Sequence, residues 1–152
     1  RPIDHEEALR ILKHAEEVGL VLQPSNAKKV VNICTCCGCC CQILKNLKKL
    51  PKPAEFVASN YYAIVDQAEC TGCETCLERC QMDAIQMQEG TAMISRDRCI
   101  GCGLCVPTCP DAAITLVEKP EDNRCEPPRH FMETYMRIAK ERLANLQDSS
   151  GK

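Results

Sequence analysis

Eight of the fifteen cysteines form two matching runs whose spacing suits ligands of polynuclear metal clusters. In each run, three cysteines are separated by two residues each, and a fourth cysteine follows after three further residues. A short loop with this spacing can surround one corner of an iron–sulfur cubane. The first run contains Cys70, Cys73, Cys76 and Cys80, and the second contains Cys99, Cys102, Cys105 and Cys109. These cysteines predict one-electron chemistry at bound iron–sulfur clusters.

Zinc is the main alternative metal for these eight thiols, because paired C-x2-C units bind Zn²⁺ tetrahedrally. Such zinc sites use two pairs separated by a spacer. Here three cysteines stand at consecutive third positions and a fourth follows closely. The spacing therefore favours iron–sulfur clusters over zinc.

The two runs belong to an internal repeat with an offset of 29 residues, which relates residues 69–87 to residues 98–116. The repeat matches all four cysteines, and it also pairs Gly72 with Gly101. It predicts two cluster-binding loops related by approximate twofold symmetry. We expect each loop to be followed by a short helix that ends at its fourth cysteine.

Two positions depart from the repeat. Gln81 follows Cys80 where Pro110 follows the last cysteine of the second run. We expect this change to alter solvation or reduction potential modestly and locally. Glu74 stands where the second repeat has Gly103. Its carboxylate would lie close to the first cluster and should make that cluster harder to reduce.

A second group of cysteines precedes the repeat and has no regular spacing. It consists of Cys34, Cys36, Cys37, Cys39, Cys40 and Cys41. Adjacent cysteines in an extended chain point to opposite sides, whereas a turn at Gly38 could gather a subset. Three interpretations stay open: a further iron–sulfur cluster with ligands from Cys125 or another chain, a zinc or other soft-metal site, or a thiol/disulfide pair without metal.

The remaining segments predict an α+β protein. Its repeated part, with small antiparallel sheets, resembles a ferredoxin-like dicluster domain and lies between an N-terminal helical, cysteine-rich segment and a C-terminal helix. Hydrophobic periodicity and turn residues support this assignment. The predicted helices cover residues 4–18, 42–50 and 131–146, and the predicted strands cover residues 62–65, 85–87, 92–94 and 114–116. We expect residues 147–152 to be disordered.

Three segments divide the chain in this interpretation. Residues 1–60 form the cysteine-rich segment, residues 61–118 the dicluster domain, and residues 119–152 a connector and the last helix. The middle is acidic, since residues 66–122 hold eleven Asp or Glu against four Lys or Arg. Such a surface can steer a basic partner protein.

Composition argues against three other classes: disulfide-rich secreted proteins, membrane-spanning proteins and nucleic-acid-binding proteins. The crowded cysteines do not suit an orderly disulfide framework, and no apolar stretch approaches the length of a membrane span. We therefore expect a cytoplasmic protein in a cell that keeps thiols reduced. Nucleic-acid binding is disfavoured because the net charge is −2 and aromatic residues are few. The start at Arg1 suggests a piece of a longer chain.

Residues 62–117 resemble a bacterial two-[4Fe–4S] (dicluster) ferredoxin domain. The resemblance implies that the fourth ligands cross over between the repeats. One cluster would be held by Cys70, Cys73, Cys76 and Cys109, and the other by Cys99, Cys102, Cys105 and Cys80. Together with the CTCCGCCC segment, the whole chain resembles the C-terminal part of longer multi-cluster ferredoxin-like proteins of anaerobes.

These observations predict an electron-transfer protein that passes single low-potential electrons through two [4Fe–4S] clusters to or from a partner redox enzyme. No catalytic residue is predicted, which argues against an enzyme. The alternative is a redox sensor or a catalytic iron–sulfur centre at Cys34–Cys41, fed by the ferredoxin-like domain. A third hypothesis is a structural subunit that carries electrons inside a larger complex.

Overall fold

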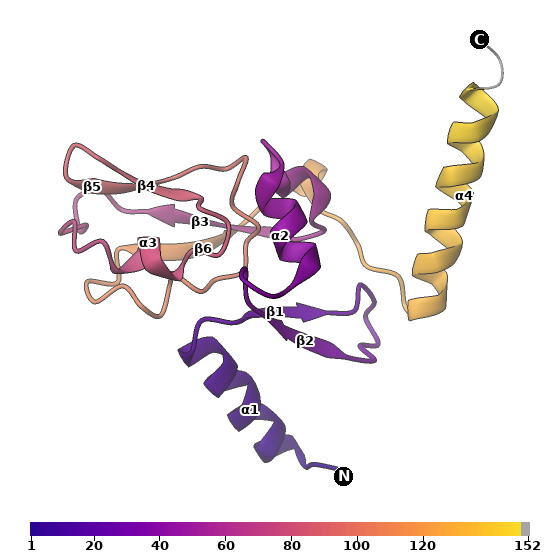
Figure 1. The fold of residues 1–152 in the computed structure, drawn as a ribbon, viewed down its shortest axis with the longest axis horizontal. Helices are drawn as coiled ribbons and strands as arrows, with labels where there is room; N and C mark the ends of the chain where they lie inside the picture. The colour runs from indigo at the N-terminus through magenta and orange to yellow at the C-terminus, as the bar shows by residue number, and fades with distance from the viewer. Residues whose placement is uncertain (150–152) are drawn as a thin grey trace. The chain divides into compact units, whose positions relative to one another are not determined.

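The computed structural model describes residues 1–149, with side chains as far as residue 143, and has two compact units. The main unit contains residues 1–22 and 35–125, and the second unit contains residues 23–34 and those from 126 onward. Helices mix with small antiparallel sheets (Figure 1). The predicted α+β class is therefore confirmed.

Four strands of the main unit pair into two small antiparallel sheets. Strand β3 (Tyr61–Val65) pairs with β6 (Ile114–Glu118), and β4 (Ile85–Gln88) pairs with β5 (Thr91–Ile94). The offset of 29 residues relates β3 to β5 and β4 to β6, so it also relates one sheet to the other. All four predicted strands are confirmed, and the internal repeat extends to the strand before each cysteine run.

The short helix predicted after each loop forms in one repeat only. Helix α3 (Thr75–Arg79) ends just before Cys80, as expected. The equivalent residues 104–108 form turns instead. Pro107 explains the difference, because proline has no N–H to donate and disfavours helical geometry at the preceding residue.

The N-terminal part of the main unit contributes two helices. Helix α1 (His5–Glu17) begins at Asp4, whose carboxylate accepts a hydrogen bond of 2.7 Å from the N–H of Glu7. Helix α2 (Gln42–Lys49) follows the cysteine group and buries Leu44 completely. Both predicted helices are confirmed within a residue of their expected ends.

A hairpin between these helices was not predicted. Strand β1 (Val21–Pro24) pairs with β2 (Ile33–Cys36), which runs directly into the cysteine group. The turn expected after β1 is present, and the N–H of Ser25 donates to the carbonyl of Asn32 at 3.0 Å. Two short 3₁₀ turns, Pro53–Phe56 and Glu121–Asn123, flank the dicluster region.

The main unit has two hydrophobic clusters. The first lies between the sheets and includes Ala63 and Ala92 at equivalent strand positions. The second joins the N-terminal part to the repeats, where Leu44 packs with Met82 and Leu104. Helix α2 could not bury these contacts alone, so this part of the cysteine-rich segment folds on the dicluster region.

The second unit consists of helix α4 (Phe131–Ser149) and the strand connection that precedes β2. The N–H of Lys28 donates to the carbonyl of Pro128 at 2.8 Å, and the Thr134 hydroxyl donates to the carbonyl of Asn26 at 2.7 Å. Of the tail expected to be disordered, residues 147–149 continue the helix and residues 150–152 lie outside the described residues. None of the described helices has the length and apolar character needed to cross a membrane.

Candidate metal centres

The first candidate centre is a small pocket lined by four predicted cluster ligands. Three of these cysteines come from the loop of the first repeat, and the fourth comes from the second repeat. They are Cys70, Cys73, Cys76 and Cys109. Apolar side chains, including Met87 and Ile114, complete the wall.

The second candidate centre is a small pocket lined by Cys80, Cys99 and Cys105. Cys102 does not line this pocket, but the thiols of Cys80 and Cys99 are near enough to help raise its pKa, after burial as the main cause. Here the fourth cysteine of the first repeat joins three from the second. Each cavity thus draws thiols from both repeats, in the grouping that the dicluster resemblance implies.

Backbone N–H groups donate to sulfurs at equivalent places in the two centres. The N–H of Ala92 in β5 donates to Cys70 Sγ at 3.4 Å, and the N–H of Ala63 in β3 donates to Cys99 Sγ at 3.5 Å. The N–H of Ala84 also donates to Cys80 Sγ at 3.2 Å. Donors aimed at sulfur stabilise thiolates, which are the form that ligates metal.

The pKa values of four of these thiols differ from that of an ordinary cysteine. Burial is the main cause that raises the pKa of Cys76 and Cys102, and it raises the pKa of Cys105 to about 12. Neighbouring thiols add to each shift. Cys73 differs, because hydrogen bonds from Thr75 lower its pKa. Thiolates gathered this closely repel one another, so their donor set suits metal centres that carry positive charge.

Two equivalent glycines allow the cluster loops to pass close to neighbouring backbone. Gly72 and Gly101 have φ angles of +73° and +68°. A Cβ atom would lie 2.2 Å from the carbonyl oxygen of Gly90 at the first site and of Tyr61 at the second. No other residue type fits at either position without moving the backbone.

Glu74 adopts the same left-handed backbone as the glycine it replaces in the repeat. Its φ is 64°, against 79° for Gly103, and it precedes α3. A residue with a side chain is strained in this region. Glu74 also lines the first cavity, next to the first group of cysteines.

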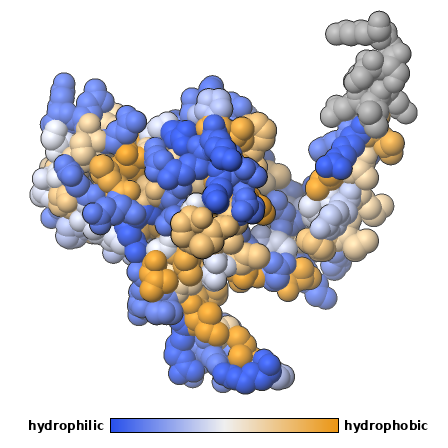
Figure 2. Space-filling model, viewed as in Figure 1, coloured by the Kyte–Doolittle hydropathy of each residue, from blue (hydrophilic) through white to orange (hydrophobic). Residues whose placement is uncertain are grey.

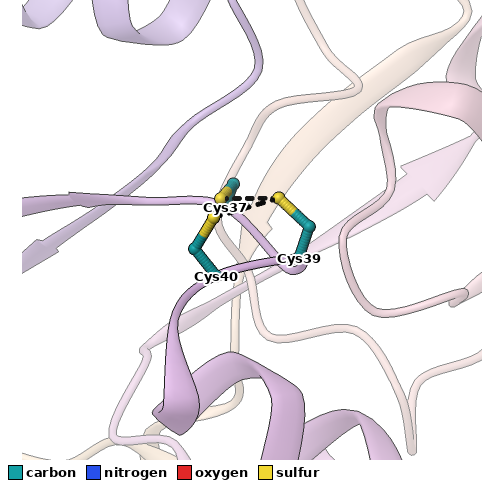
Figure 3. Close-up of side chains that lie close together, drawn as sticks. All are labelled: Cys37, Cys39 and Cys40. Atoms are coloured by element: carbon teal, nitrogen blue, oxygen red, sulfur yellow. Dashed lines mark hydrogen bonds between the residues drawn. The ribbon is translucent and has the colours of Figure 1, made fainter.

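Three sulfurs of the second cysteine group converge at the turn before α2 (Figure 3). The Sγ atoms of Cys37, Cys39 and Cys40 all lie within 4.8 Å of one another. The Cys37–Cys39 distance is 2.9 Å and the Cys39–Cys40 distance is 3.5 Å. The side-chain hydrogen bond with Cys39 is the main cause that lowers the pKa of Cys37 to about 6. The side-chain hydrogen bond between Cys40 and Cys37 is the main cause that raises the pKa of Cys40 to about 11. We call these three residues the cysteine triad.

The other cysteines of this group lie elsewhere. Cys34, in the second unit, accepts a hydrogen bond of 3.4 Å from the side-chain amide of Asn32. Cys36 and Cys41 pack against the hydrophobic cluster around Leu44. Cys125, considered as a distant ligand, is not among the three gathered sulfurs, and Asn60 holds its backbone.

Three side chains that hold the N-terminal part on the repeats were missed from the sequence. The guanidinium of Arg79 donates to the carbonyl of Glu16 at 2.6 Å, at the end of α1. Arg98 donates to the carbonyl of Lys48 at 3.0 Å, at the end of α2. Gln81 bonds to both the triad turn and the residue after α1. The repeat contained the signal, since all three differ in type from their counterparts at the offset of 29 residues.

Comparison with known families agrees with the geometry of the two cavities. Residues 63–116 match the family model of the 4Fe-4S dicluster domain. The match confirms the predicted resemblance of residues 62–117 almost to its ends. No curated protein matches the chain. The resemblance of the whole chain to longer proteins of anaerobes stays a prediction.

Proposed function

We propose that the 4Fe-4S dicluster domain of residues 63–116 binds two [4Fe–4S] clusters and passes single electrons to or from a partner redox protein. The observation that carries this proposal is that each cavity gathers thiols from both repeats. The proposed ligand sets are Cys70, Cys73, Cys76 and Cys109 for the first cluster, and Cys99, Cys102, Cys105 and Cys80 for the second.

A [4Fe–4S] cluster supplies reversible one-electron transfer at potentials between about −700 and +450 mV. The residues of this chain act on that potential in opposite directions. Backbone N–H groups of Ala63 and Ala92 donate to ligand sulfurs, which favours the reduced form. The acidic surplus of residues 66–122, eleven against four, favours the oxidised form. We propose that the acidic charge dominates and that both potentials are low.

The exposed corners of the two centres suit exchange of electrons with a partner. Cys73 and Cys102 occupy equivalent positions in the repeat. Both residues reach the surface, although the surrounding protein shields the thiol of Cys102 enough to raise its pKa. Glu74 and Asp111 line the cavity beside the first corner, and the carboxylate of Asp111 accepts a hydrogen bond of 2.7 Å from Thr71. We propose a partner with a basic surface around its own redox centre.

The chain also has features of a component of something larger. Helix α1 and the residues around it expose apolar side chains, among them Leu9, Ile11 and Val18 (Figure 2). Ile11 and Val18 are seven residues apart and so lie on one side of the helix, where exposed apolar side chains favour burial against another protein segment. We propose that the electron-transfer domain works within a longer chain or a complex.

The first test is metal analysis of anaerobically prepared protein, with EPR of the reduced sample. We expect about eight irons and eight sulfides per chain, with interacting cubane signals. Cys76→Ser and Cys105→Ser should each remove one cluster and leave about four irons. Cys125→Ser is the control, because the bonds of that residue to Asn60 use its backbone only. Zinc in place of iron at the eight cysteines would refute the proposal.

The same analysis tests the alternative of an iron–sulfur centre at Cys34–Cys41. That alternative requires iron beyond the eight atoms of two cubanes. It also requires the additional iron to disappear on Cys→Ser changes at Cys37, Cys39 and Cys40. An iron count that does not respond to these changes would exclude a third cluster there.

A further inference from the structure

We propose that the cysteine triad, Cys37, Cys39 and Cys40, is a site for one mononuclear thiophilic cation, Zn²⁺. The three sulfurs come from four consecutive residues and point toward one another (Figure 3). Their donor atoms are all thiol sulfurs, which select soft or borderline cations over Mg²⁺ and Ca²⁺. This site uses none of the eight cysteines of the dicluster domain.

The distances between the sulfurs distinguish a single ion from a cluster. A tetrahedral zinc with Zn–S bonds of about 2.3 Å separates its sulfurs by about 3.8 Å. The triad sulfurs lie within 4.8 Å of one another, and two of the pairs, at 2.9 Å and 3.5 Å, are shorter than that edge, so a single ion could bind all three after a small outward shift. Ligands of a cubane each bind a different iron, so their sulfurs must stand farther apart.

The dicluster cysteines provide the comparison within the same chain. Among the residues that the structure describes, the triad is the group of three candidate ligands whose donor atoms all lie within 4.8 Å of one another. Seven of the eight dicluster cysteines line two separate pockets instead. The described dicluster thiols are thus spaced more widely than those of the triad.

Backbone contacts hold the triad in this arrangement. The N–H of Cys41 donates to the carbonyl of Cys37 at 3.1 Å and closes a turn just before α2. Inside the turn, the N–H of Gly38 donates to the side-chain oxygen of Gln81 at 2.8 Å. A Cβ at Gly38 would lie 3.2 Å from the backbone oxygen of Gln81, so glycine allows the close approach. The turn is thereby fixed to the domain rather than left as a loose loop.

A dithiol that cycles to a disulfide explains less of this geometry. A disulfide joins two sulfurs at about 2.05 Å and has no use for a third. Three thiols converge here, and Cys39 contacts both of its neighbours. Three protein ligands leave the fourth position of a tetrahedral zinc for solvent or another ligand. The exposure of Cys39 and Cys40 places that position within reach of solvent.

The test uses the full chain with its clusters, supplied with Zn²⁺ and then desalted. Zinc and iron are counted per chain, and zinc K-edge X-ray absorption identifies the neighbours of the zinc. We expect about one zinc, with sulfur neighbours at about 2.3 Å and no iron neighbour. The double variant Cys39→Ser/Cys40→Ser should lose the zinc and keep its iron. The control Cys125→Ser should keep both.

Several results would overturn the proposal. Wild-type protein without zinc, or with zinc bound by oxygen and nitrogen only, would do so whatever the variants show. So would zinc that survives the double variant, or iron found at the triad. The two proposals can fail separately. Wild-type protein without iron–sulfur clusters would refute the proposed electron-transfer function, because iron binding depends on the eight dicluster cysteines. The zinc absorption spectrum of the same sample would still show whether the triad binds zinc.

Discussion

The side-chain oxygen of Gln81 accepts a hydrogen bond of 2.8 Å from the backbone N–H of Gly38. The amide nitrogen of the same side chain donates to the carbonyl of Gly19 at 3.0 Å. Gln81 directly follows Cys80, so one side chain links the loop of the second centre to the triad turn and to the end of α1. The expected local effect on solvation is thus accompanied by a docking role.

Replacing Gln81 by alanine should loosen the N-terminal part of the main unit. The change removes two partly buried hydrogen bonds and leaves the N–H of Gly38 without this acceptor. We expect the free energy of unfolding to fall by about 1–3 kcal/mol. Hydrogen exchange should quicken at residues 19–41. Gln86→Ala, on the exposed face of β4, is the control, and equal exchange in both variants would contradict the prediction.

Two arginines should hold two different helices. Arg79 donates to the carbonyls of Glu16 and Glu17, whereas Arg98 donates to those of Lys48 and Leu50. Such charged donors satisfy the carbonyls that a helix end leaves open. We expect Arg79→Met to speed hydrogen exchange in α1, and Arg98→Met to speed it in α2, with losses of about 1.5–3 kcal/mol each.

Each arginine variant is the control for the other. Faster exchange throughout the main unit in both variants would show that the two side chains act on global stability, and the prediction would fail. The Arg98→Lys variant should show hydrogen exchange in α2 at a rate between those of wild type and Arg98→Met. One ammonium cannot reach every carbonyl that the guanidinium reaches.

The sequence predicted the repeated part of this fold better than the part docked on it. Strands β3 to β6 were predicted from apolar patterns that occur in both copies of the repeat. Ala63 and Ala92, at equivalent positions in the two copies, are both buried. The hairpin of β1 and β2 was missed, because these short strands, unlike β3 to β6, have no second copy in the repeat to support the assignment. Contacts such as that between Arg98 and Lys48 join residues far apart in sequence, and no local pattern reports them.

The candidate sites show the same division. Regular spacing singled out the eight dicluster cysteines. In the second group, six thiols in eight residues left the converging subset undetermined. Only the turn closed between Cys37 and Cys41 brings three of them together. Pro107, which prevents a second short helix, was visible in the sequence and could have corrected that prediction.

Two glycines of the second loop should respond very differently to alanine. At Gly101 a Cβ would meet the carbonyl oxygen of Tyr61 at 2.2 Å, so the loop cannot keep its path. At Gly103 the nearest atom is a side-chain carbon of Leu116 at 3.8 Å, which leaves only backbone strain of about 1–2 kcal/mol. We expect Gly101→Ala to lose the second cluster.

Iron content and thermal unfolding check this comparison. Gly103→Ala should retain about eight irons, and Gly101→Ala about four, with the EPR signals of one cubane. Both positions have positive φ, at 68° and 79°, so the pair separates close approach from strain. Equal iron in the two variants would show that the contact with Tyr61 does not limit cluster binding.

Glu74 should lower the reduction potential of the first cluster through its charge. The residue lines the first cavity in the left-handed conformation that Gly103 has in the second loop. An adjacent negative charge disfavours adding an electron. About 1 kcal/mol of repulsion across partly solvated protein corresponds to roughly 40 mV for one electron. We therefore expect Glu74→Gln to raise one midpoint potential by tens of millivolts.

Glu74→Gly separates this charge effect from the backbone effect. It removes the carboxylate and also relieves the strain at φ 64°, so it should raise the potential like Glu74→Gln and add about 1 kcal/mol of stability. Glu78→Gln, an exposed change in α3 that leaves Glu74 intact, is the control. Redox titration by EPR follows both clusters, and unfolding by denaturant follows stability. Potentials that stay unchanged in both Glu74 variants would show that solvent screens this carboxylate completely, whereas a shift in Glu74→Gly alone would assign the effect to the backbone.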